Sequence, residues 1–281
     1  MTTVALDDTT LWYDETGEGR PLVFVHGGWS NAHAWTPQVE SFADEYRVIR
    51  LDVRGHGRTG ATDEERYSID LFTDDLERLL DHLNVESPLL CGLSLGGMVV
   101  QNYLDRHPDR AAGALLAGPV RSMPPVDMPT WVKPFCSPLP ALAGSLATMG
   151  SEATFRSMLA GITVTTGSRW LSIDPSVRRA AIATAGEVDP DEFHKVFAAL
   201  YRFDPPDLSH VETPVALVFG DHEAPLVKYQ GRRLAAEVGA SVTEIPDAGH
   251  LVNLDAPSAF DETLADLLAD LDAPRAGAAS D

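Results

Sequence analysis

The fold is decided by the segment Pro88-Leu-Leu-Cys-Gly92-Leu-Ser94-Leu-Gly96-Gly97. Its first four residues form a short apolar run, typical of a strand buried on both faces of a parallel sheet, and a helical pattern begins near Leu95. The string Gly-x-Ser-x-Gly arises by chance in many chains, but here it joins a strand to a helix. Such a sharp turn strains the backbone of the serine and points its hydroxyl out of the carboxyl edge of the sheet. We therefore predict that Ser94 is a nucleophile.

The chain around this segment alternates strand and helix patterns. Strand patterns occupy 3–6, 10–13, 21–25, 46–51, 88–91, 114–117, 214–219 and 241–245. Helical patterns occupy 34–43, 69–83, 95–107, 151–159, 175–185, 190–201, 226–238 and 257–271. The first two strands read as a hairpin, and the later alternation indicates right-handed crossovers. We predict an α/β fold with a doubly wound, mostly parallel sheet of eight strands.

The alternation stops at Gly118 and resumes only at Pro214. That interval is far longer than the two to six residues typical of a helix-to-strand connection. It is rich in proline at first and then becomes helical. We predict a helical cap at 120–207, inserted between the two parts of a core at 1–119 and 208–272, with a flexible tail at 273–281.

Composition excludes several classes of protein. No apolar run is long enough to cross a bilayer, because glycines and a serine interrupt the longest one, at 88–100. The first residues carry no basic region followed by an apolar block, so we expect neither a secretory signal nor a transit peptide, and a cytoplasmic protein. The two cysteines, Cys91 and Cys136, do not form a Cys-x-x-Cys motif, and we expect free thiols rather than a zinc or iron–sulfur site.

The chain is strongly acidic, with 42 acidic against 21 basic residues and a formal net charge of -21. Nucleic acid is a poor partner for it, because phosphate binding requires clustered lysine and arginine. Such a surface suits high salt, where charges are screened. Two sources fit this composition, a halophile and a mesophile with GC-rich DNA.

Nine histidines compete to be the base that a serine nucleophile needs. His250 follows the last strand pattern directly, which places it in a loop at the same edge of the sheet as Ser94. We predict His250 as the base. The principal competitors are His26, in His-Gly-Gly-Trp, and His56, in Asp-Val-Arg-Gly-His-Gly.

Five landmarks in order carry a resemblance to a known family. They are His26-Gly-Gly28, Asp52-Val-Arg-Gly-His-Gly57, the turn at Ser94, Phe219-Gly-Asp-His-Glu223 and Ala248-Gly-His250. With them the chain resembles the α/β-hydrolase family over nearly its whole length. The chain order nucleophile, acid, histidine is the order that this family uses.

The resemblance also implies where the third catalytic residue lies. In the family the acid commonly stands three residues after the glycine that ends the late strand, which here is Glu223 after Gly220. Glutamate replaces the usual aspartate, and either carboxylate can orient an imidazole. Asp221 remains the alternative acid.

The resemblance implies an oxyanion hole made of two backbone N–H groups. One belongs to Leu95, directly after the nucleophile, and the other to Gly28 or, as an alternative, Trp29. Trp29 is also a candidate for the pocket wall. Trp131, in the insertion, is a candidate for the core of the cap or for the substrate pocket.

These expectations combine into one function, a cofactor-free and metal-free serine hydrolase that cleaves a carboxylic ester or lactone of a small molecule. Carbon–carbon bond hydrolysis, acyl transfer and perhydrolysis remain open, because they use the same three groups. A ligand-binding receptor on the same fold is a further alternative. A dehydrogenase is disfavoured, since the Gly-x-Gly-x-x-Gly at 55–60 is followed by a polar loop rather than an apolar helix. The sequence leaves the oligomeric state open.

Overall fold

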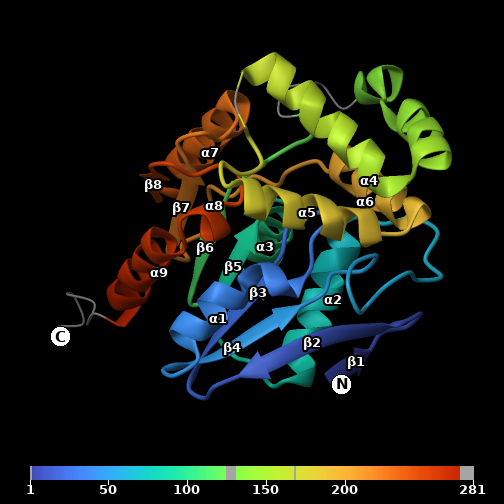
Figure 1. Cartoon of the computed structure of the whole chain (residues 1–281). Coiled ribbons are helices and arrows are strands. Elements are labelled where there is room, and N and C mark those ends of the chain that lie inside the picture. The colour runs from blue at the N-terminus through green and yellow to red at the C-terminus, as the bar shows by residue number, and fades with distance from the viewer. Residues whose placement is uncertain (1, 125–130, 168, 273–281) are drawn as a thin grey trace, which may run out of the picture.

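The computed structural model describes residues 2–124, 131–167 and 169–272. Within them, eight strands form one sheet in the order β1-β2-β4-β3-β5-β6-β7-β8 (Figure 1). The strands are β1 (Thr2–Ala5), β2 (Thr10–Thr16), β3 (Arg20–Val25), β4 (Tyr46–Leu51), β5 (Leu89–Leu93), β6 (Gly113–Ala117), β7 (Val215–Gly220) and β8 (Ser241–Ile245). The predicted eight-stranded, doubly wound sheet is therefore confirmed.

The strand directions follow from the sequence patterns. β1 and β2 form the hairpin and pair antiparallel, and β2 also pairs antiparallel with β4. Every pairing from β4 through β3, β5, β6 and β7 to β8 is parallel. The residues of β5, β6 and β7 are all buried, as expected for apolar strands with both faces covered.

Helices cover both faces of the sheet (Figure 1). α2 (Ile69–His82) packs against α3 (Leu95–Arg106) on one face, and α1 (Thr36–Phe42) packs against α8 (Val252–Asp255) and α9 (Pro257–Asp272) on the other. The 3-10 helix η1 (Ala32–Trp35) precedes α1, and α7 (Pro225–Val238) connects β7 to β8. Trp35 stacks on Phe24 at 4.7 Å between ring centroids, joining η1 to the centre of the sheet.

Between β6 and β7, the residues that the structure describes form four helical elements. They are η2 (Lys133–Cys136), α4 (Leu139–Thr166), α5 (Pro175–Glu187) and α6 (Pro190–Arg202). α4 packs against both α5 and α6, and the group lies beyond the carboxyl ends of the parallel strands (Figure 1). We call these four elements the insertion helices.

α4 is much longer than the helical pattern at 151–159. Pro138 and Pro140 stand at its beginning, where proline is tolerated, and Gly150 breaks the helical geometry inside it with φ 75° and ψ 179°. Pro138, Pro140 and Gly150, which lie outside the predicted helical pattern, therefore lie at the start of α4 or at the break inside it. The predicted tail at 273–281 lies outside the described residues.

The remaining expectations concern the two cysteines and a membrane-spanning segment. Cys91 is free and buried, and Cys136 is free and exposed. In the part of the chain that the structure describes, none of the helices combines the length and the apolarity needed to cross a bilayer.

Candidate active site

Ser94 occupies the turn between β5 and α3 in a strained conformation, with φ 53° and ψ -109°. The neighbouring glycines make this turn possible. A Cβ atom on Gly92 would lie 2.4 Å from the carbonyl oxygen of Gly96, and one on Gly96 would lie 2.1 Å from the carbonyl oxygen of Val25. The turn therefore places Ser94 at the carboxyl end of β5, with the N-terminus of α3 behind it.

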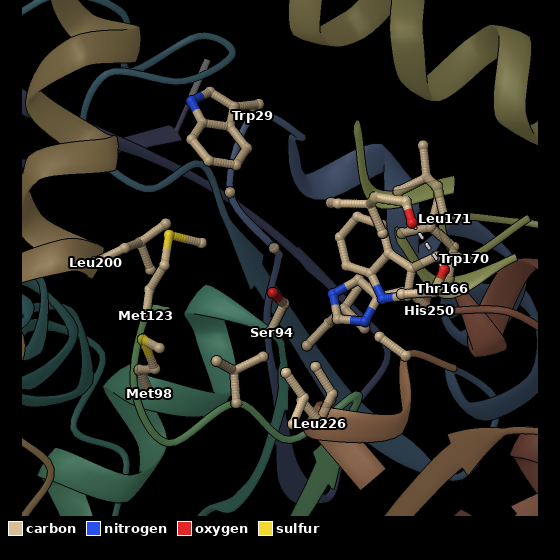
Figure 2. Close-up of a pocket in the computed structure, with 18 of the residues that line it drawn as sticks. Trp29, Ser94, Met98, Met123, Thr166, Trp170, Leu171, Leu200, Leu226 and His250 are labelled. Carbon is tan, nitrogen blue, oxygen red and sulfur yellow. Dashed lines mark hydrogen bonds between the residues drawn. The ribbon is translucent and has the colours of Figure 1, made fainter. Parts of the chain in front are cut away.

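His250 and Glu223 form a buried pair beside this turn. The distance from His250 Nδ1 to Glu223 Oε2 is 2.6 Å, and the two side chains are 4 % and 0 % exposed. This bond leaves His250 Nε2 as the ring nitrogen available to a substrate or nucleophile. His250 and Ser94 both line one cavity (Figure 2). The end of β6 joins them: the Ser94 N–H donates to the Ala117 carbonyl at 2.9 Å, and a Cβ atom on Gly118 would lie 2.8 Å from the His250 ring.

Trp170, from the connection between α4 and α5, contacts both members of this pair. Its indole N–H donates to Glu223 Oε1, which also accepts from the backbone N–H of Ala224 at 2.7 Å. Its ring packs on the imidazole of His250 at 4.5 Å between centroids, and its carbonyl accepts from the His250 backbone N–H at 2.7 Å. Figure 2 shows Trp170 and His250 together on one side of the cavity.

Asp221, the alternative acid, lies elsewhere. Its Oδ1 accepts from the backbone N–H of Ala248 at 3.2 Å and lies 3.9 Å from His222 Nε2. Although burial opposes ionisation, hydrogen bonds from the backbone N–H groups of Ala248 and Asp247 lower its pKa. The structure thus brings Glu223, and not Asp221, to His250.

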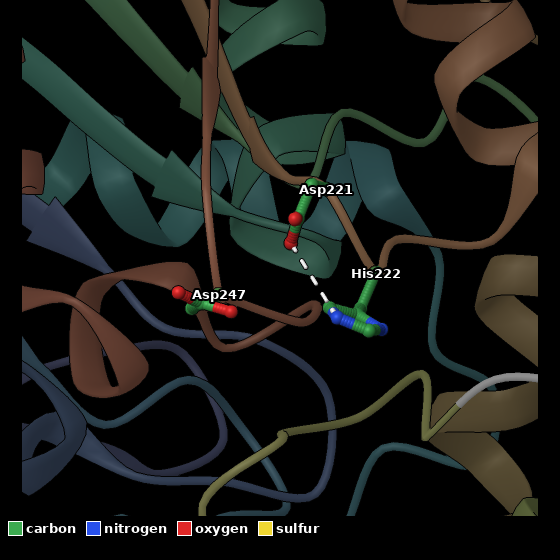
Figure 3. A group of neighbouring side chains, drawn as sticks. All are labelled: Asp221, His222 and Asp247. Atoms are coloured by element: carbon green, nitrogen blue, oxygen red, sulfur yellow. Dashed lines mark ion pairs between the residues drawn. The ribbon is translucent and has the colours of Figure 1, made fainter.

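Asp221, His222 and Asp247 gather at the surface (Figure 3). One possible ligand atom from each lies within 4.8 Å of the others, and all three side chains are exposed. Exposed acidic groups often lie close together without binding an ion, and Asp221 already accepts a hydrogen bond from the Ala248 N–H. We assign no metal to this group.

The loop after β3 lies against the turn at Ser94. A Cβ atom on Gly28 would lie 3.9 Å from Leu95 Cβ, so the two residues predicted to form the oxyanion hole are neighbours. Leu95 is the first residue of α3, where N–H groups have no partner within the helix. The N–H of Trp29, in contrast, donates to His56 Nε2 at 2.9 Å, which removes Trp29 as an oxyanion donor.

His26 and His56 hold this loop instead of acting at the cavity. His26 Nε2 accepts from the Val53 N–H at 3.0 Å, and the rings of the two histidines lie 5.0 Å apart. Burial lowers the pKa of His26 to about 4 and that of His56 to about 3, where the charge of His26 also contributes. Both rings are therefore neutral at pH 7 and serve as structural hydrogen-bond partners.

The cavity above Ser94 has a volume of about 540 Å³. Met98, Met123 and Leu200 lie on one side of Ser94, and His250 and Trp170 lie on the other (Figure 2). Trp29 also forms part of the wall and stacks on Phe193 of α6 at 4.6 Å. Trp131 is absent from the described lining, and its side chain is 73 % exposed, so the structure does not bring it to this cavity.

Comparison with known proteins identifies the family. The family model described as "Alpha/beta hydrolase family" matches residues 22–263. The chain belongs to the alpha/beta hydrolase family. As a member of this family the chain is an enzyme, and proteins similar to it include an enol-lactonase and a carboxylesterase.

Two solved structures and one curated relative show how far this hydrolase resembles known members. The 3-oxoadipate enol-lactonase 2 of Acinetobacter baylyi is 26 % identical over 270 residues, which are 93 % of this chain and 94 % of that protein. The enol-lactonase of Burkholderia xenovorans LB400 is 27 % identical with a TM-score of 0.79, covering 95 % of this chain and 100 % of that one. Est816, described as an N-acyl homoserine lactone degrading enzyme, is 26 % identical with a TM-score of 0.75, covering 94 % and 99 %.

Trp170 is the residue of this hydrolase site that the sequence did not reveal. It stands in a short connection next to Arg169, with no motif around it. Its contacts with Glu223 and His250 join residues 53 and 80 positions away, so they depend on how the insertion folds back onto the sheet.

Proposed function

We propose that this hydrolase cleaves a carboxylic ester or lactone of a small molecule through an acyl-enzyme on Ser94. The observation that carries the proposal is the buried bond from His250 Nδ1 to Glu223 Oε2 at 2.6 Å, beside a serine in the strained turn after β5. A serine hydroxyl requires such a base, and the base requires a third group that fixes its tautomer.

The proposed reaction has two halves. His250 Nε2 takes the proton of Ser94 Oγ while that oxygen attacks the carbonyl carbon, and the carbonyl oxygen becomes an oxyanion bound by the N–H groups of Gly28 and Leu95. The intermediate collapses, and His250 protonates the departing alcohol oxygen. A water molecule, deprotonated by His250, then attacks the acyl-enzyme, and the carboxylic acid leaves as Ser94 recovers its proton.

Glu223 stabilises the imidazolium that forms in each half. Its carboxylate is oriented by three donors, the His250 ring, the Trp170 indole and the Ala224 N–H. Since a fixed carboxylate needs no reorganisation when the imidazole becomes charged, the longer side chain of glutamate can replace aspartate here.

We propose further that residues 120–207 act as a cap over a core formed by 1–119 and 208–272. The support is that α4 supplies Phe155, Ile162 and Thr166 to the cavity wall and α6 supplies Leu200. Specificity would then depend on these insertion helices, while the sheet carries Ser94, His250 and Glu223.

The test is labelling with a fluorophosphonate, together with kcat/KM on p-nitrophenyl esters and on lactones such as N-octanoyl homoserine lactone. Ser94→Ala is expected to abolish labelling and to lower kcat/KM by about 10⁴-fold or more. Glu223→Gln is expected to lose about 10⁴-fold and the matched Asp221→Asn less than about threefold. Full activity of Ser94→Ala, or the reverse order of the two acid variants, would refute the assignment.

A further inference from the structure

We propose that the cavity selects uncharged substrates with an apolar chain and rejects substrates whose chain carries a carboxylate. This inference rests on the proposed function and names its substrate class. Among the described residues that line the cavity there is no Asp, Glu, Lys or Arg, and His250 is the one titratable side chain. Met98, Met123 and Leu200 line the cavity on one side of Ser94 (Figure 2).

A carboxylate in this cavity would lack a counter-charge. Two cations on the adjoining segments are held by other groups. Arg121 donates through Nη2 to the Pro206 carbonyl at 2.8 Å and contacts Glu237 at 3.2 Å, while its buried Nη1 has no hydrogen-bond partner. Lys133, on η2, donates to the Phe203 carbonyl at 2.9 Å. Because an unpaired carboxylate loses its hydration on entry, burying it in such a wall is strongly unfavourable.

The volume of the cavity leaves room for a chain of several carbons. A volume of about 540 Å³ corresponds to about 18 water-sized groups at roughly 30 Å³ each. An acyl chain of about eight carbons fits within that space, together with the ester and a small leaving group. The net charge of -21 also repels anions in solution, and salt screens this repulsion without changing the wall of the cavity.

Three matched esters test the proposal on the intact protein. They are p-nitrophenyl octanoate, the p-nitrophenyl monoester of octanedioic acid, whose chain ends in a carboxylate, and the same compound with that carboxylate methylated. We expect kcat/KM for the carboxylate ester to be at least about 100-fold below octanoate in both 0.1 M and 1 M KCl, and the methylated ester to stay within about tenfold. Agreement within tenfold between the carboxylate ester and octanoate, at either salt, overturns the substrate class.

The same assay separates this proposal from the proposed function. If Ser94→Ala hydrolyses all three esters as well as the unchanged protein does, the function fails and the substrate class with it. If Ser94→Ala is inactive but the unchanged protein accepts the carboxylate ester, only the substrate class fails.

A matched pair of variants adds a second measurement. Thr166→Lys places a cation at the cavity wall of α4, whereas Val164→Lys adds the same charge to the same helix at a position that is 85 % exposed. We expect the ratio of kcat/KM for the carboxylate ester to that for octanoate to rise at least about tenfold in Thr166→Lys and less than about twofold in Val164→Lys. Equal ratios in the two variants contradict a role for the cavity wall.

A separate observation concerns catalysis, and from it we infer that Trp170 is a positioning residue for both the acid and the base. It donates to Glu223, stacks on the His250 ring at 4.5 Å and accepts the backbone N–H of His250. A Cβ atom on Gly249 would lie 2.6 Å from the Trp170 carbonyl oxygen, so the loop before His250 fits closely against this residue. The insertion thereby fixes the carboxylate and the imidazole relative to each other.

Trp170→Phe tests this inference, because it keeps a ring against His250 and removes the indole donor. Loss of a hydrogen bond to a carboxylate is expected to lower kcat by about tenfold. It also leaves more negative charge to face His250, so the acid limb of the kcat/KM profile moves to higher pH. The matched control is Trp131→Phe, which changes an exposed tryptophan of the same insertion and is expected to move neither quantity.

A purely structural role for Trp170 predicts a different result. Trp170→Phe would then lower the melting temperature or the fraction of active enzyme and leave the acid limb in place. A profile with an unchanged acid limb, or a kcat within about twofold of the unchanged protein, overturns the inference.

Discussion

Acidification is expected to destabilise this protein through the buried histidines His26 and His56. Each ring accepts a backbone N–H at Nε2, from Val53 and Trp29 respectively, and each donates from Nδ1 to a carbonyl. A proton added at Nε2 would convert that acceptor into a donor facing an N–H group. The two rings lie 5.0 Å apart, so a charge on one disfavours protonation of the other. The charge of Asp52 favours protonation of His56, but burial outweighs it.

The magnitude follows from the two lowered pKa values. Burial lowers the pKa of His26 from 6.5 to about 4 and that of His56 to about 3. The unfolded chain therefore binds more protons than the folded chain below about pH 6.5, and stability falls as the pH falls through this range. Between pH 7.5 and pH 5 each histidine removes about 2 kcal/mol, or about 4 kcal/mol for the pair.

The free energy of unfolding should be measured by urea titration with tryptophan fluorescence at pH 7.5, 6.5, 5.5 and 5.0, above the range where most carboxylates titrate. His56→Gln, whose amide oxygen can accept the Trp29 N–H, is expected to show about half the pH dependence. The control His33→Gln changes an exposed ring and should keep the full dependence. A change below about 1 kcal/mol across this range, or NMR signals of the folded rings that titrate near pH 6.5, would refute the reasoning.

Three further predictions concern stability. Asp75→Asn removes one of the two carboxylates that pair with the buried Arg54 guanidinium, and because Asp8 remains 2.6 Å from Arg54 Nη1, the expected cost is about 1 to 3 kcal/mol by urea unfolding; a cost below about 0.5 kcal/mol contradicts this. Gly96→Ala places a Cβ atom 2.1 Å from the Val25 carbonyl, whereas in Gly97→Ala the nearest contact is 3.3 Å, so only the first should lower the melting temperature severely; equal melting temperatures would show that the turn can relax. If the net charge of -21 reflects a halophilic source, activity and stability rise with KCl from low to molar concentration, and flat profiles refute that origin.

The sheet and the turn at Ser94 could be predicted because their signals are local. Short apolar runs such as 88–91 and 114–117, alternating with helical patterns, are typical of strands covered on both faces of a parallel sheet. The glycines around Ser94 are required by contacts of 2.1 to 2.4 Å that no side chain could occupy. Local sequence therefore determines these features almost completely.

The partner of His250 was less certain, since Asp221 and Glu223 lie in the same turn and either could orient an imidazole. The path of the chain after β7 decides which carboxylate reaches the histidine. Asp221 accepts a hydrogen bond from the Ala248 N–H, whereas the Glu223 side chain is completely buried against the His250 ring. The full length of α4 was missed for a related reason. The helical geometry does break at Gly150, directly before the predicted pattern at 151–159, and what the sequence did not reveal is the helical segment before the glycine and the last residues of α4, which packs against α5 and α6.

Trp170 shows why the rest of the site depends on tertiary structure. The same insertion that lines the cavity also supplies a donor to Glu223 and a ring against His250. A change in the insertion that reshapes the cavity can therefore displace the acid and the base, because one short connection serves both. It follows that variants selected for a new substrate by changes near Trp170 should lose kcat together with the old specificity, whereas changes at Met98, Met123 or Leu200, on the other side of Ser94, should alter specificity with kcat largely retained.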